Sequence, residues 1–124
     1  MTVSLSDFLG CLRLVEGELK AAADSALSAF DRITYSMLVD CLKSEDPAAV
    51  KEAIDQLVKE ERAIAIPPLY LVAHAHPVPW VRQQASAGLQ KLGDSVQIEK
   101  LTAGKDTLQA VKLLVEEYGH YKMS

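Results

Sequence analysis

Apolar residues recur every three or four positions over the first 30 residues, the spacing that places side chains on one face of an α-helix. Charged residues such as Arg13, Glu16 and Lys20 fall largely off this stripe. The stripe consists of Leu5, Phe8, Leu9, Leu12, Val15, Leu19, Ala22, Ala23, Ala26, Leu27 and Phe30. Ser4 and Asp7 have the spacing of an N-cap pair, so we expect a long helix to begin there. The alternative to one long helix is a helix that breaks within residues 24–31.

Two more helices are expected before residue 62. The second, ending near residues 43–44, is marked by the apolar residues Tyr35, Leu38, Cys41 and Leu42. Asp46 and Pro47 then form a start signal, because Asp46 can accept from free amides and Pro47 has no N–H that needs a partner. The apolar face of the third helix consists of Val50, Ile54, Leu57 and Val58.

The most apolar segment is AIAIPPLYLVAHA, residues 63–75. Alternation at residues 63–66 would suit a strand, but a single strand has no partner with which to pair. We therefore expect a short buried helix, with Pro67 and Pro68 in its first turn or at a kink. Pro77 and Pro79 should end it.

The last third of the chain predicts three further helices. The first begins at Pro79 and ends at Gly93, with Val81, Ala85, Leu89 and Leu92 facing inward. Residues 95–101 form a short helix closed by Gly104. Asp106 and Gln109 cap the last helix, which we expect to end at Gly119.

The helix starts repeat at a nearly constant spacing. Val50-Lys51, Val81-Arg82 and Val111-Lys112 lie 31 and then 30 residues apart, each near the start of a helix. Such a period is typical of stacked helix pairs, because one pair cannot bury its own apolar face. We expect an all-α fold of six or seven helices, arranged as a short right-handed α-solenoid of antiparallel helix pairs. Residues 1–44 would form an N-terminal helical cap.

Composition and charge narrow the classes of function. The 124 residues suit one domain, and 49% apolar residues suit a globular one. Residues 1–62 hold 7 basic and 12 acidic groups, and residues 63–124 hold 6 and 5. Without a basic stripe, nucleic acid is a poor partner. We also expect no secretory signal and no membrane span, and hence a cytoplasmic protein. In the cytoplasm Cys11 and Cys41 should be free thiols, and we assign both to core packing.

One segment, VPWVRQQASAGLQKLGD at residues 78–94, resembles the first helix of HEAT-like repeats of the phycobilisome-lyase type. The matching residues are Val81, Arg82, Ala85, Ser86, Ala87, Leu89, Leu92, Gly93 and Asp94. The resemblance is best over residues 50–105, and it implies two to three HEAT-like, armadillo-type repeats over residues 45–119. It also implies a role in protein binding, or as a subunit of a bilin lyase or of a phycobilisome assembly or degradation system.

No set of residues predicts catalysis, a cofactor or a metal site. His74 and His76 lie two apart, so on a helix their rings point to opposite sides and cannot share a metal. Glu60-Glu61 and Glu116-Glu117 are adjacent pairs that diverge on a helix, so we expect solvated faces. Cys41 near a helix C-terminus is a poor nucleophile. We interpret the two histidines as residues at a helix end, in the seam between repeats.

The residue types that dominate protein interfaces gather at this seam. We therefore predict a partner-binding site made of Tyr70, His74, Trp80, Arg82 and Gln83. The alternative for Trp80 is core packing over the seam. The expected function is a non-catalytic adaptor that binds another protein, with the lyase subunit as the alternative and a homo-oligomeric assembly protein as a third.

Overall fold

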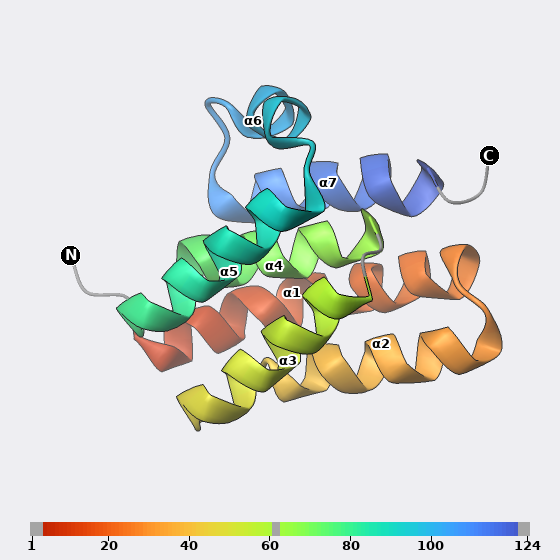
Figure 1. Cartoon of the computed structure of the whole chain (residues 1–124). Coiled ribbons are helices and arrows are strands. Elements are labelled where there is room, and N and C mark those ends of the chain that lie inside the picture. Colours follow the sequence, from red (N-terminus) through yellow and green to blue (C-terminus); the bar gives the residue numbers. More distant parts are fainter. Residues whose placement is uncertain (1–3, 61–62, 122–124) are drawn as a thin grey trace.

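The computed structural model describes residues 4–60 and 63–121. For residues 25–26 and 119–121 it describes the backbone only. Within these ranges every regular element is a helix and there is no strand, which confirms the all-α prediction. The α-helices are α1 (Leu5–Ala26), α2 (Ala29–Cys41), α3 (Pro47–Lys59), α4 (Ile66–Ala75), α5 (Pro79–Leu92), α6 (Ser95–Thr102) and α7 (Thr107–Tyr121). A short 3₁₀ helix, η1 (Ala63–Ala65), precedes α4 (Figure 1). No helix in the described part is long and apolar enough to cross a bilayer.

The helix starts are where the capping signals predict them. Ser4 Oγ accepts a hydrogen bond from the Asp7 N–H at 3.1 Å, and Asp46 Oδ1 accepts from the Ala48 N–H at 3.0 Å. Asp106 Oδ1 accepts from the Gln109 N–H at 2.8 Å. Each bond pairs an amide that has no partner within the first turn of its own helix.

The long N-terminal run divides into two helices, as the alternative reading of residues 24–31 allows. Leu27 has extended backbone angles, φ −122° and ψ 156°, and Ser28 caps a new helix through the Asp31 N–H. The break corrects the predicted stripe, because Phe30 now belongs to α2 and is 78% exposed. The buried side chains of α1 are Phe8, Leu12, Val15, Leu19 and Ala23.

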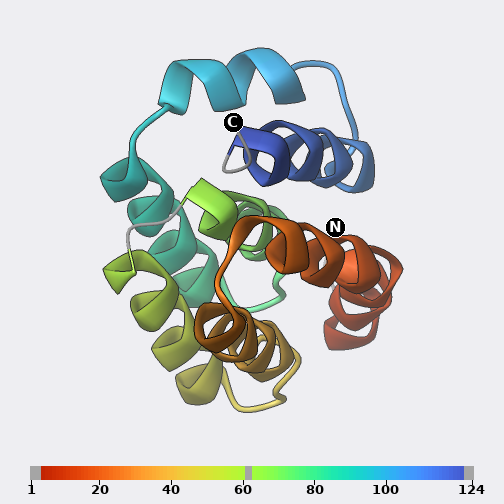
Figure 2. The ribbon, with the colours of Figure 1, turned by 90° about the vertical axis from the view of Figure 1, so that its right-hand side faces the viewer.

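The core is centred on α4. Eight of its ten residues are buried, as expected for a predominantly apolar helix, while His74 in its last turn is exposed. Pro67 and Pro68 lie in its first turn, where no intrahelical donor is needed, so the prediction of a buried helix with prolines at its start is confirmed. Figure 2 shows α4 in the middle of the molecule, with α1, α5 and α7 around it.

Two of the three periodic valines lie on neighbouring helices. Val50 on α3 and Val81 on α5 are both fully buried, and α3 packs along α5 (Figure 1). Val111 is also fully buried, but its helix α7 packs on α1, α4 and α6. The 31-residue spacing therefore corresponds to a direct helix–helix contact between α3 and α5, whereas the next spacing leads to α7, which packs mainly on α1 and α4.

Two smaller predictions need correction. Cys41 is exposed rather than packed in the core, whereas Cys11 is partly buried and packs against the core. Gly119 does not end the last helix, which continues to Tyr121. Gly93 and Gly104 do follow helices and have positive φ angles of 85° and 73°, so glycine is needed at both positions.

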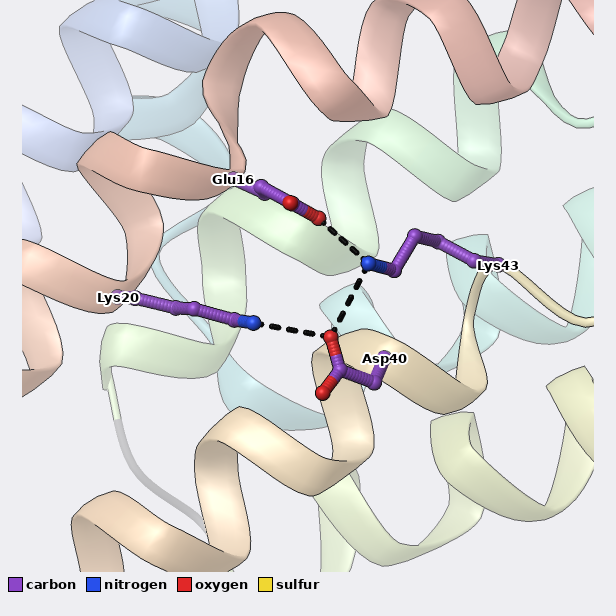
Figure 3. Close-up of polar contacts among 4 residues, drawn as sticks. All are labelled: Glu16, Lys20, Asp40 and Lys43. Atoms are coloured by element: carbon purple, nitrogen blue, oxygen red, sulfur yellow. Dashed lines mark hydrogen bonds and ion pairs between the residues drawn. The ribbon is translucent and has the colours of Figure 1, made fainter.

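A network of ion pairs joins α1 to the end of α2. Lys43 Nζ lies 2.8 Å from Glu16 Oε2 and 3.2 Å from Asp40 Oδ1, which also binds Lys20 Nζ at 2.9 Å (Figure 3). The hydrogen bond from Lys20, helped by the one from Lys43, lowers the pKa of Asp40. The N-terminal helix pair is thus held by charge along its solvent edge and by apolar contacts beneath.

Candidate functional site

The two histidines end α4 and differ sharply in their surroundings. His74 lies in the last turn and is exposed, and its ring stacks on that of Tyr70 with centroids 4.1 Å apart. His76 is the C-cap residue and is only 2% exposed. The prediction that both histidines lie at a helix end is confirmed.

His76 is held as a neutral ring. Its Nδ1 accepts a hydrogen bond from the Val78 N–H at 3.1 Å, so the proton is on Nε2. Nε2 has no hydrogen-bond partner among the described residues, and the ring edge meets Phe8 with centroids 4.8 Å apart. Burial, together with the nearby charge of Arg82, lowers the pKa of His76.

Arg82 fixes the corner between α4 and α5. Its Nη1 donates a hydrogen bond of 2.6 Å to the carbonyl oxygen of His76. A carbonyl at the end of a helix lacks an intrahelical partner and carries partial negative charge, so a guanidinium is well suited to it. Arg82 therefore has a structural role at this corner in addition to its predicted role in partner binding.

Trp80 and Gln83 form the exposed part of the predicted site. Trp80 is 46% exposed near the start of α5, and Gln83 is also exposed. Gln83 belongs to the lining of an open hollow on α5. The hollow has a volume of about 380 Å³ and is lined by Pro79, Arg82, Gln83, Ser86, Ala87 and Gln90. Amide, hydroxyl and methyl groups side by side suit contacts with a protein surface more than they suit enclosure of a small molecule.

The five predicted site residues thus divide by exposure. Trp80, Gln83 and His74 are accessible, whereas Tyr70 is only 8% exposed and supports His74 by stacking. Arg82 is half-buried and has one face on the hollow. The accessible residues come from the end of α4 and the start of α5, so a single rigid corner carries them.

The predicted site omitted an exposed apolar stripe on α2. Phe30, Ile33 and Met37 are 78%, 63% and 61% exposed and are spaced by three and four residues. The spacing that indicates this stripe is visible in the sequence. Once the chain breaks at Ser28, α2 carries this set in addition to Tyr35, Val39 and Leu42, which are buried. Two apolar stripes on one helix indicate that one of them faces outward.

The adjacent glutamate pairs are exposed where the structure describes them. Glu116 and Glu117 are both exposed on α7, and Glu61 of the Glu60-Glu61 pair lies outside the described residues. In the part of the chain that the structure describes, no three residues of His, Cys, Asp or Glu are placed to hold a metal ion.

Comparison with known proteins gives no match, whether to a family model, to a curated protein or to a solved structure.

Proposed function

We propose that this chain is a non-catalytic, cytoplasmic protein-binding adaptor that docks its partner on the corner between α4 and α5. The observation that carries the proposal is the half-exposed indole of Trp80 on α5, the helix whose residues Pro79 and Gln83 line the hollow. Tryptophan combines large apolar area with few rotatable bonds, and it is enriched among the residues that dominate binding energy.

The roles of the five residues follow from their contacts. Trp80 is the apolar anchor, and Gln83 offers an amide donor and acceptor beside it. His74 is a second contact, held in one orientation by Tyr70 beneath it. Arg82 holds the corner through the His76 carbonyl, so the surface loses little conformational entropy on binding.

The arrangement we propose for the whole chain is a short right-handed α-solenoid of HEAT-like helix pairs. The contact between α3 and α5 at the 31-residue spacing supports it, as does the close approach at Gly88. In this proposal residues 1–44 are the cap, residues 45–119 hold two to three repeats, and α7 closes the stack over α4 and α1.

A crosslinking experiment tests the binding surface. A photoreactive amino acid at position 83 should crosslink to one dominant partner in lysate, and Trp80→Ala should abolish that adduct while circular dichroism stays unchanged. Leu14→Ala is the matched control, since Leu14 is 65% exposed on α1. If the adduct persists in Trp80→Ala, or is lost equally in Leu14→Ala, then this corner is not the binding surface.

The lyase alternative has a separate readout. The purified chain is mixed with a bilin and an apo-phycobiliprotein, and absorbance is followed for the shift that accompanies chromophore attachment. A shift that depends on the chain would replace the adaptor by the lyase subunit.

A further inference from the structure

The connection between α4 and α5 has few backbone donors with which to hold its shape. It runs from His76 to Val78, and α5 begins at Pro79. Two of these four residues are prolines, which have no N–H to donate. The His76 N–H continues the hydrogen bonding of α4, since it donates to the Val72 carbonyl oxygen at 3.2 Å. The Val78 N–H is therefore the one amide of this connection that can fix where α5 begins.

The side chain of His76 accepts this remaining donor. The Val78 N–H donates to His76 Nδ1 at 3.1 Å, and Val78 is the N-cap residue of α5. The carbonyl oxygen of the same histidine accepts from Arg82 Nη1 at 2.6 Å. Two hydrogen bonds that tie the start of α5 to the end of α4 therefore end on His76.

The bond from Val78 requires an unprotonated Nδ1. A protonated imidazole carries an N–H on both nitrogens and can accept no hydrogen bond. The new proton on Nδ1 would point at the Val78 N–H, so that two donors would face each other. The amide would lose its acceptor, and the ring would have to turn or move away.

The groups around the ring also oppose a positive charge. His76 is buried, and its ring meets Phe8 of α1 edge-on. From α5, the guanidinium of Arg82 adds a charge of the same sign, and burial and this charge together lower the pKa of His76. His74 on α4 and Asp7 beside Phe8 also titrate, but both are exposed, so solvent screens their effect on the ring. The closed corner is therefore built for a neutral histidine.

From this geometry we propose that the corner between α4 and α5 is a latch, which opens in acid when His76 takes up a proton and releases the Val78 N–H. Pro79 and Trp80 follow Val78 directly, so release of this cap residue changes the position of the indole. In neutral solution the closed latch presents Trp80 and Gln83, and in acid the partner is released. This consequence rests on the binding surface proposed above, whereas the movement of the latch is a property of the chain alone.

Acid is the direction that opens the latch. An open corner with an ordinary histidine binds the proton more tightly than the closed corner, in which the pKa of His76 is lowered. The closed form is therefore favoured above about pH 6.5, the ordinary histidine pKa, and is progressively lost below it. Histidines with a conditional hydrogen bond of this kind are the usual element of pH-sensitive protein contacts.

Fluorescence of the isolated chain tests the latch without a partner, because Trp80 is the only tryptophan of the 124 residues. Emission is followed from about pH 7.5 to about 4.5, with circular dichroism to show that the helices persist. The wild type should show a transition below about pH 6.5, and the Val78 amide resonance should move with the same midpoint. His76→Asn keeps an acceptor for the Val78 N–H but takes up no proton, so its emission should not change. His74→Gln should keep the transition, which excludes quenching by the exposed ring nearby.

The effect on binding has a separate readout. The crosslink from position 83 should fall about threefold or more across the emission transition of the wild type, and it should stay constant in His76→Asn. Absence of an adduct at every pH would remove the proposed binding surface, and Trp80 emission would still decide on the latch. An adduct that persists through the emission transition overturns the regulatory role.

The latch itself is overturned by emission that does not vary with pH, or that changes equally in His76→Asn. Should that variant fail to fold, NMR of the wild type decides. The ring carbons of His76 and the Val78 amide must then titrate with one midpoint, and two different midpoints overturn the latch.

Discussion

Gly88 on α5 lies so close to Val58 on α3 that a Cβ atom at position 88 would be 2.6 Å from Val58 Cγ2. Real Cβ atoms do not approach a neighbour so closely, and the branched valine side chain has little freedom to move away. The absence of a side chain at position 88 therefore sets how near α3 and α5 can pack.

Gly88→Ala should destabilise the chain by about 1–3 kcal/mol, because overpacking outweighs the helix propensity that alanine adds. Urea unfolding followed by circular dichroism measures this loss. Adding Val58→Ala should restore part of it, since the clashing methyl group is removed. Gly17→Ala is the control. A Cβ there meets no atom within 4 Å, so this variant should be more stable than the wild type by about 0.5–1 kcal/mol. Equal effects at both glycines would contradict the close packing of α3 on α5.

Lys43→Met should lower the free energy of unfolding by up to about 1 kcal/mol at low ionic strength, because Glu16 and Asp40 lose the cation that they share. The loss should shrink in about 1 M salt, where exposed charges are screened within about 3 Å. Lys100→Met is the comparison, since Lys100 lies in no ion pair of the described chain. A loss that salt does not change would mean that packing of the lysine stem, not charge, joins α1 to α2.

His76 should make the fold less stable in mild acid. The pKa of the buried ring is lowered by burial and by Arg82, so the unfolded chain takes up a proton that the folded chain excludes. Stability should fall as pH drops below about 6.5, the ordinary histidine pKa, and level off below the folded-state pKa.

The measurement is the difference in unfolding free energy between wild type and His76→Asn, a variant that keeps an acceptor for the Val78 N–H. This difference should be nearly constant above pH 7 and should shift in favour of the variant toward pH 5. His74→Gln should show a smaller change, because His74 is exposed, although burial lowers the pKa of this ring in the same direction. A difference that does not vary with pH would show that the ring of His76 titrates as it does in the unfolded chain.

The helices themselves were predictable because their signals are local. Caps such as Asp46 and Asp106 act within one turn, and the uniformly apolar 63–75 segment has only one stable position, the centre of the core.

The errors come from relations that are not local. Phe30 matched the spacing of the first stripe, and only the extended backbone at Leu27 turns it outward. Cys41 likewise fits a helical pattern whose orientation depends on where α3 packs. The position of α7 could not follow from the 30-residue spacing, since that spacing is equally compatible with a place beside α5 and with its contacts on α1 and α4. The candidate site was predicted by residue type, but the division between exposed Trp80 and buried Tyr70 depends on tertiary packing.

The central claim is that α4 is the buried axis of a rigid scaffold whose outer helices are free to bind. Backbone amide hydrogen exchange, resolved by residue with NMR, tests it most directly. Amides of Leu69 through Ala75 should be the slowest and should exchange only through global unfolding, while those of α6 should exchange through local opening. If the α4 amides exchange as fast as those of α6, then α4 is not the core and the binding surface proposed on α5 loses its support.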